Sequence, residues 1–222
     1  MRTYPRNPIP LFMTLSVLAL ATPAQAAPPD GWRLVASIGA SHLPDQTTRI
    51  SGTGDIDDTY RVQNDGGFSA GLGLRHGYGN GWETEIAWEY RSNDTELLPS
   101  AGGPALSGGN YASNTFFLNV RRYLGQVFGG EAYLGAGVFV MQELDIDYET
   151  TPGERSFEQG GAWGGQLLAG VVKPLDQHWF VGAEARVASL TGETLEAESG
   201  TGSLGPIDYE PVSVQLHLGW TF

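Results

Sequence analysis

The sequence predicts an all-β protein, namely an eight-stranded antiparallel up-and-down transmembrane β-barrel. Three observations support this fold class. Apolar and polar residues alternate over segments of about ten residues, which is the length of a membrane-spanning strand. The connections between these segments alternate between long and short, and the chain begins with the pattern of a secretory signal.

Residues 1–26 have the composition of a cleavable signal peptide. Arg2 and Arg6 precede an apolar run at residues 11–21, and Ala24-Gln25-Ala26 forms a small-x-small cleavage site. The apolar run is shorter than the roughly 20 residues that a membrane-spanning helix needs. We therefore expect residues 1–26 to be removed and residues 27–222 to form one β-barrel domain. The chain has no cysteine, which excludes disulfides and a cysteine nucleophile.

The last segment shows the alternation most clearly. From Val212 to Phe222, apolar side chains occupy every second position, and polar residues or glycine occupy the others. Strands of soluble proteins are typically only about 5–6 residues long, so this longer pattern indicates a strand with one face toward lipid. Seven further segments share it, and the expected strands are residues 31–42, 67–78, 82–92, 111–123, 131–141, 161–173, 178–189 and 211–222.

The connections between these strands predict the topology and the orientation. Long connections at 43–66, 93–110, 142–160 and 190–210 alternate with short ones, so the long ones gather at one end of the barrel. Outer-membrane barrels have short periplasmic turns and longer extracellular loops. We therefore expect periplasmic termini and extracellular long loops. The aromatic residues beside the short turns predict an interfacial girdle: Trp32, Tyr78, Trp82, Trp179 and Trp220.

Two segments resemble a known family. Residues 133–138 and the terminal residues 216–222 are similar to strands of the small outer-membrane β-barrel superfamily, which includes the OmpA transmembrane domain, OmpX-like proteins and outer membrane protein β-barrel domains. This resemblance implies a Gram-negative outer-membrane protein. It also implies that Trp220 and Phe222 form the signal read by the barrel-assembly machinery. The expected partners are that machinery, outer-membrane lipids and lipopolysaccharide, and the expected state is a monomer.

The inward-facing positions predict a polar network inside the barrel. An eight-stranded barrel leaves an interior that side chains roughly fill, and opposite charges there should pair, because an isolated buried charge is costly. This network could be a structural plug, a gated narrow conduit or a catalytic carboxylate pair. Its expected members are Arg33, Arg75, Glu83, Glu85, Glu89, Arg91, Arg121, Glu184, Arg186 and His217.

The long connections are strongly acidic. They contain eighteen Asp or Glu residues against Arg49, Arg61 and Arg155. Carboxylates at close spacing can bind calcium, so we consider a metal site, although the glycine and glutamate frame of an EF-hand loop is missing. Residues 144–148 also fit a strand that extends above the membrane. The candidate metal ligands are Asp55, Asp57, Asp58, Asp145 and Asp147.

Composition and motifs narrow the function. Without residues 1–26 the chain has 10 basic and 25 acidic residues, a net charge of −15, which argues against nucleic-acid binding. No His-x-Ser pair, as in outer-membrane lipid A deacylases, is present, and we expect no catalytic residues and no cofactor. The sequence favours a non-enzymatic barrel with a structural or surface-recognition role. A narrow pore for ions or small solutes, a lipid-modifying enzyme and a soluble lipocalin-like barrel are the alternatives.

Overall fold

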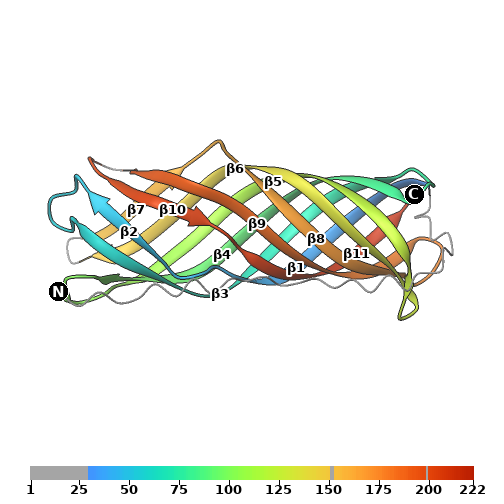
Figure 1. The fold of residues 1–222 in the computed structure, drawn as a ribbon, viewed down its shortest axis with the longest axis horizontal. Coiled ribbons are helices and arrows are strands. Elements are labelled where there is room, and N and C mark those ends of the chain that lie inside the picture. Colours follow the sequence, from blue (N-terminus) through green and yellow to red (C-terminus); the bar gives the residue numbers. More distant parts are fainter. Residues whose placement is uncertain (1–29, 151–152, 199) are drawn as a thin grey trace, which may run out of the picture.

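The computed structural model describes residues 30–150, 153–198 and 200–222, so the expected signal peptide at residues 1–26 lies outside the described residues. The described chain consists of eleven strands in one sheet (Figure 1). They are β1 (Gly31–His42), β2 (Gln46–Ser51), β3 (Asp58–Gly77), β4 (Trp82–Pro99), β5 (Leu106–Val127), β6 (Gly130–Thr150), β7 (Gly153–Gln159), β8 (Ala162–Pro174), β9 (Trp179–Ala197), β10 (Ser203–Tyr209) and β11 (Val212–Thr221). Within the described residues, no helix is long and apolar enough to cross a membrane.

Eight of these strands close a barrel. In the order β1, β3, β4, β5, β6, β8, β9 and β11, each strand pairs antiparallel with the next, and β11 pairs with β1. The predicted fold class is therefore confirmed. Short turns join the strands at the end that also holds the C-terminus (Figure 1). Gly79 and Gly81 adopt φ values of +66° and +84° in one such turn, where glycine avoids the steric penalty of a left-handed backbone.

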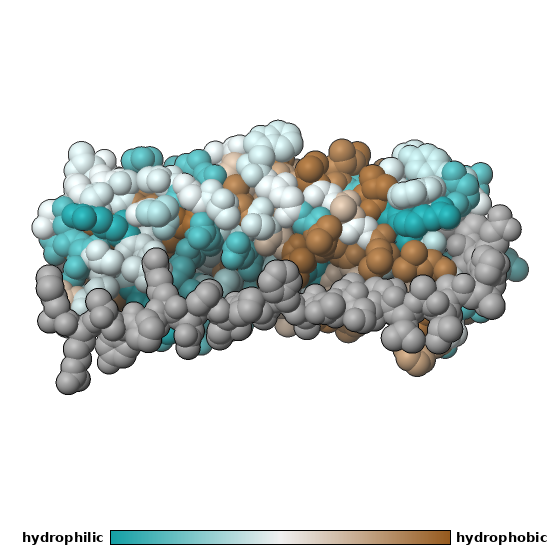
Figure 2. Space-filling view, viewed as in Figure 1, coloured by the Kyte–Doolittle hydropathy of each residue, from teal (hydrophilic) through white to brown (hydrophobic). Residues whose placement is uncertain are grey.

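The half of the barrel next to the short turns has an apolar outer surface, which we call the belt. Every second residue of its strands points outward, and large apolar side chains at these positions are exposed, including Ile38 at 66%, Ile86 at 64% and Leu216 at 60%. Figure 2 shows the hydrophobic surface gathered mainly over this half of the molecule. Many inward positions carry glycine or polar side chains, beside a smaller buried apolar and aromatic cluster of Val35, Tyr123, Tyr133, Leu168, Val172 and Phe180. This arrangement is the reverse of a soluble protein and is typical of a strand that faces lipid.

The other half of the barrel, which we call the distal half, is a second closed ring. Here β2, β7 and β10 take the places that β1, β8 and β11 hold in the belt, beside the long strands β3, β4, β5, β6 and β9. Much of the chain that was expected to form long loops is therefore strand. Of these distal strand segments, the sequence analysis predicted only residues 144–148, which extend β6.

The polarity of the wall inverts in the distal half. Its interior is packed with buried apolar and aromatic side chains, among them Leu97, Leu144, Tyr148 and Leu195, which are all fully buried. Its outer surface is mostly hydrophilic (Figure 2). Bulges mark the change: the register shifts between Asn64 and Gly67 in β3, so the inward positions switch from even to odd numbers. The distal half therefore has the core and surface of a water-exposed barrel.

Candidate functional site

The interior of the belt contains the ten polar residues expected there. Every one is at most 5% exposed, and they come from β1, β3, β4, β5, β9 and β11. Alternation places them inward because the opposite face of each strand is the apolar belt. The structure brings nine of them into one ion-paired group and attaches His217 to it: Arg33, Arg75, Glu83, Glu85, Glu89, Arg91, Arg121, Glu184, Arg186 and His217.

Arg121 lies at the centre of this group. Its Nη2 is 2.7 Å from Glu85 Oε2 and 3.1 Å from Glu184 Oε2. The hydroxyl of Tyr133 also donates a hydrogen bond to Glu184 Oε2, at 2.7 Å. Arg75 Nε donates to the other oxygen of Glu85 at 2.6 Å. Each of these carboxylates therefore has at least two cationic or hydroxyl partners, which compensates for its removal from water.

Neutral side chains complete the network. Asn119 Nδ2 donates to Glu85 at 2.7 Å, and Gln166 Nε2 donates to Asn119 Oδ1 at 2.6 Å. Nδ1 of His217 lies 3.0 Å from a guanidinium nitrogen of Arg75. Because a guanidinium group can only donate, this contact requires His217 Nδ1 to be the acceptor. The network occupies the bore with hydrogen-bonded side chains from several strands and thereby ties opposite walls together.

The backbone ladder of the described wall is interrupted beside this network; a second gap separates the β1–β11 pairing, which ends at His42 and Val212, from the β2–β10 pairing, which begins at Arg49 and Gly205. β9 pairs with β8 over a ladder that begins where Gly165 lies opposite Ser189 and continues toward the short turns. It also pairs with β7, where Glu158 lies opposite Glu196, and both pairings have the same register. Between them, residues 159–164 and 190–195 face each other without a backbone ladder. Two glycines of this stretch have a left-handed backbone, Gly161 between β7 and β8 at φ +78° and Gly192 within β9 at φ +77°.

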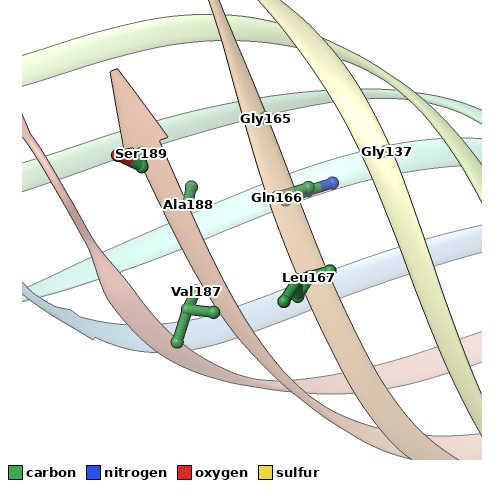
Figure 3. Close-up of a pocket in the computed structure, with 7 residues that line it drawn as sticks. All are labelled: Gly137, Gly165, Gln166, Leu167, Val187, Ala188 and Ser189. Carbon is green, nitrogen blue, oxygen red and sulfur yellow. The ribbon is translucent and has the colours of Figure 1, made fainter. Parts of the chain in front are cut away.

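A pocket of about 450 Å³ opens where this ladder stops. Its lining includes outward residues of the belt, such as Leu167 and Val187, and inward residues, such as Gln166. Figure 3 shows the strands of Leu167 and Val187 side by side, with the Gln166 side chain pointing toward the strand of Gly137. The pocket therefore joins the outer surface of the belt to the level of the buried network. The sequence analysis missed this feature, and its signal is the group of glycines at 160, 161 and 192.

The acidic residues considered for a metal site do not gather into one. Within the described residues, no group of three or more potential ligands comes together. Asp57 instead holds its own loop: hydrogen bonds from the Thr53 hydroxyl and the Gly54 backbone N–H lower its pKa from 3.8 to about 2. Asp55 pairs with Arg155 at 3.1 Å.

The carboxylates of β6 lie on the outer surface of the distal half. Asp145 accepts a hydrogen bond of 2.9 Å from the Ser156 hydroxyl, and burial raises its pKa. Asp145 and Asp147 alternate with the buried Leu144, Ile146 and Tyr148 and therefore point outward.

The aromatic residues at the short-turn end form the expected group. Trp220 stacks on His178 with ring centroids 4.7 Å apart and meets Trp179 edge-on at 4.8 Å. The backbone N–H of Phe222 donates to the carbonyl of Trp32, which closes the barrel between its first and last strands. Trp220 and Phe222 thus lie at the seam between β1 and β11.

The fold and the inverted polarity of the belt define a transmembrane β-barrel. No protein-family model matches the chain, and no curated protein matches it. Its structure is similar to the outer membrane protein OprG from Pseudomonas aeruginosa, at a TM-score of 0.63 and 12% identity over 88% of this chain and 98% of that one. Neisserial surface protein A gives a TM-score of 0.47 at 12% identity, with coverage of 87% and 100%.

A third similar structure is Ail, the attachment invasion locus protein of Yersinia pestis, with a TM-score of 0.42 at 13% identity over 87% of this chain and all of that one. The likeness to OprG shows that the chain has the fold of a small outer-membrane β-barrel, as the resemblance in the sequence predicted. At these identities the likeness establishes the fold, and function has to be argued from the site.

Proposed function

We propose that this chain is a non-enzymatic outer-membrane barrel, closed to axial flow by its ion pairs, that presents a rigid acidic platform outside the cell for surface recognition. The observation that supports it is the second closed ring with an apolar core in the distal half. Simple linkers between membrane strands need no such core. A packed barrel instead fixes the positions of surface side chains, which reduces the entropy lost on binding.

The surface charge of the platform favours basic partners. The stretches that join the predicted membrane strands contain eighteen acidic residues and three arginines. Two of these arginines, Arg61 and Arg155, already pair with Asp45 and Asp55. A partner with a positive patch would gain both affinity and association rate. Anionic lipopolysaccharide would need divalent cations between the two surfaces.

The orientation can be tested because the chain has no cysteine. Thr191→Cys places a thiol on the exposed surface of the distal half, and Leu175→Cys is the matched variant at an exposed short turn. A membrane-impermeant maleimide added to intact cells should label the first variant and not the second. The reverse labelling pattern would refute the proposed platform.

The closed bore predicts electrical silence. Purified, refolded protein in a planar bilayer should show no reproducible conductance steps, because charged side chains tied to several strands occupy the bore. Reproducible steps would favour a narrow axial pore. Mass spectrometry of lipid A from cells with and without the protein tests the non-enzymatic part, and a modified lipid A would overturn it.

A second function is favoured by the break between β8 and β9. The distal interior is apolar, the belt interior is charged, and the pocket of about 450 Å³ lies where the two meet. An apolar solute that entered from the distal end would be repelled by the ion pairs and could leave sideways into the lipid. Passage would require the packed distal side chains to move aside.

Locking the break tests this second function. Trp163→Cys/Thr191→Cys joined by a short bifunctional cross-linker would bridge the unpaired part of the two strands. Leu167→Cys/Val187→Cys is the matched control, because these residues are paired in the ladder. Loss of transfer of a small aromatic probe into vesicles in the first variant alone would support lateral passage. Equal transfer by both cross-linked variants and the unmodified protein would exclude it.

A further inference from the structure

One arginine of the belt, Arg122 of β5, points outward and is exposed. Among the described residues it has no carboxylate partner, and its contacts are one hydrogen bond and one aromatic ring. The negative charge that balances it therefore has to come from outside the protein. The other arginines of the belt point inward, and each forms an ion pair with a glutamate: Arg33, Arg75, Arg91, Arg121 and Arg186.

Arg122 lies where the apolar surface of the belt meets the short-turn end. The next outward residues of β5 are Val120 and Leu118, which are 42% and 52% exposed and face lipid. The register partner of Arg122 is Trp82, the first residue of β4. Tryptophan is enriched at the level of the lipid headgroups, and a charge on the lipid-facing wall is tolerated best near that level. Arg122 therefore lies at headgroup depth.

The β3–β4 turn and Trp82 hold the guanidinium group of Arg122 in place. Nη1 donates to the Asn80 carbonyl oxygen at 2.6 Å, and the guanidinium carbon lies 5.2 Å from the centroid of the Trp82 ring. Gly81 provides the space, because a Cβ at this residue would lie 2.7 Å from Nη1. These contacts orient the guanidinium group before a ligand arrives, which reduces the entropy lost on binding.

One edge of the guanidinium group remains free. The contacts within the chain use Nη1 and one face of the planar group, whereas Nε and Nη2 have no hydrogen-bond partner in the described part of the chain. The N–H groups of Nε and Nη2 on their shared edge are parallel, so they can donate to two oxygens of one phosphate group. The apolar side chains of Val120 and Leu118 continue from this edge toward the middle of the belt.

We propose that Arg122, held by Trp82 and the β3–β4 turn, is the binding site for one glycerophospholipid of the leaflet at the short-turn end. Nε and Nη2 donate to the two free oxygens of the phosphodiester, and the acyl chains lie on Val120 and Leu118. The phosphate supplies the counter-charge that Arg122 lacks within the chain. The site lies on the belt, apart from the distal platform, so it does not depend on the proposed surface recognition.

Native mass spectrometry of the refolded protein tests the site, because it counts the lipids retained on release from micelles. The native protein should retain one dioleoylphosphatidylglycerol in preference to dioleoylglycerol, which has the same acyl chains and no phosphate. Arg122→Gln should weaken this retention about tenfold, because the charged hydrogen bonds to the phosphate are lost. Lys173→Gln is the matched control, since Lys173 is also an exposed cation of the belt at the short-turn end, on β8.

Three results would overturn the proposal. Equal retention of the two lipids would show that the phosphate is not recognised. An equal loss in Arg122→Gln and Lys173→Gln would show general attraction between charges. Release of the lipid by millimolar inorganic phosphate would show a site for phosphate alone.

Solid-state NMR in phosphatidylglycerol bilayers gives an independent measurement. A dipolar contact between arginine side-chain nitrogen and lipid phosphorus should be present in the native protein and in Lys173→Gln. It should be lost in Arg122→Gln. A contact of the same strength in all three proteins would refute the assignment to Arg122.

Discussion

Arg121→Met is the sharpest test of how the interior stabilises the barrel. The Arg121 side chain is fully buried and bridges Glu85 and Glu184. Breaking a buried ion pair by removing one partner costs about 3–5 kcal/mol, because the other charge stays buried. Glu85 keeps Arg75 and Glu184 keeps Arg186, so we expect a loss of about 3 kcal/mol in the free energy of unfolding, the lower end of that range.

The assay is a reversible urea titration of the refolded protein in lipid vesicles, followed by tryptophan fluorescence. Arg61→Met is the matched control, since Arg61 pairs with Asp45 at 2.9 Å but is 59% exposed. Its loss should stay below about 1 kcal/mol, because solvent screens an exposed pair. If Arg121→Met costs no more than Arg61→Met, the ion pairs do not hold the barrel together.

Three other predictions concern the wall, the belt and a distal loop. Gly137→Ala places a methyl group 2.7 Å from the Leu118 carbonyl oxygen and should cost about 1–3 kcal/mol in the same titration, whereas at Gly165 the nearest atom is 3.9 Å away and alanine should be tolerated. Equal effects at the two glycines would contradict the described packing of the wall. Leu216→Arg should destabilise the protein by about 2–4 kcal/mol in vesicles, because the side chain faces lipid, while Thr191→Arg on the distal surface should be neutral. Asp57 has a lowered pKa, so its contribution to loop order is complete above about pH 4 and disappears as the pH falls through about 2. Hydrogen exchange of residues 52–57 should therefore be faster in Asp57→Asn at pH 7 and similar in both proteins below pH 2.

The two halves of the barrel place apolar side chains on opposite faces of the same long strands. In the belt, apolar side chains face lipid, so the polar side chains inside must pair with one another. In the distal half, water takes up the polar side chains and the apolar groups pack inside. Bulges make this change possible without ending a strand, because one extra residue moves every following side chain to the opposite face. In β6 the extra residue lies opposite Asn114 and Thr115 of β5. The inward-facing residues therefore change from odd numbers, which end at Met141, to even numbers, which begin at Leu144.

The extra residues in β3 and β6 also explain why the distal strands escaped the sequence analysis. A period of two identifies a strand only while its phase is constant, and Gln142 and Glu143 interrupt the phase in β6. The extension at 144–148 remained recognisable because its own alternation is strict. Ring closure by β2, β7 and β10 could not be predicted. Each of these short strands pairs locally with a neighbouring long strand, but the ring is closed by the β2–β10 and β7–β9 pairings, whose residues lie far apart in the sequence.

The sequence by itself determined the eight-stranded architecture and the identity of the buried polar residues. Both follow from local alternation, since a strand with one apolar face must place its other residues inside. Tertiary structure alone decided which charges meet. The ion-paired group that links Arg33 to Arg91 joins five different strands, so the spacing along any one strand carries no information about it. The break beside Gly165 likewise appears only in the tertiary structure, because the barrel brings Gly161, between β7 and β8, close to the register position of Gly192 in β9.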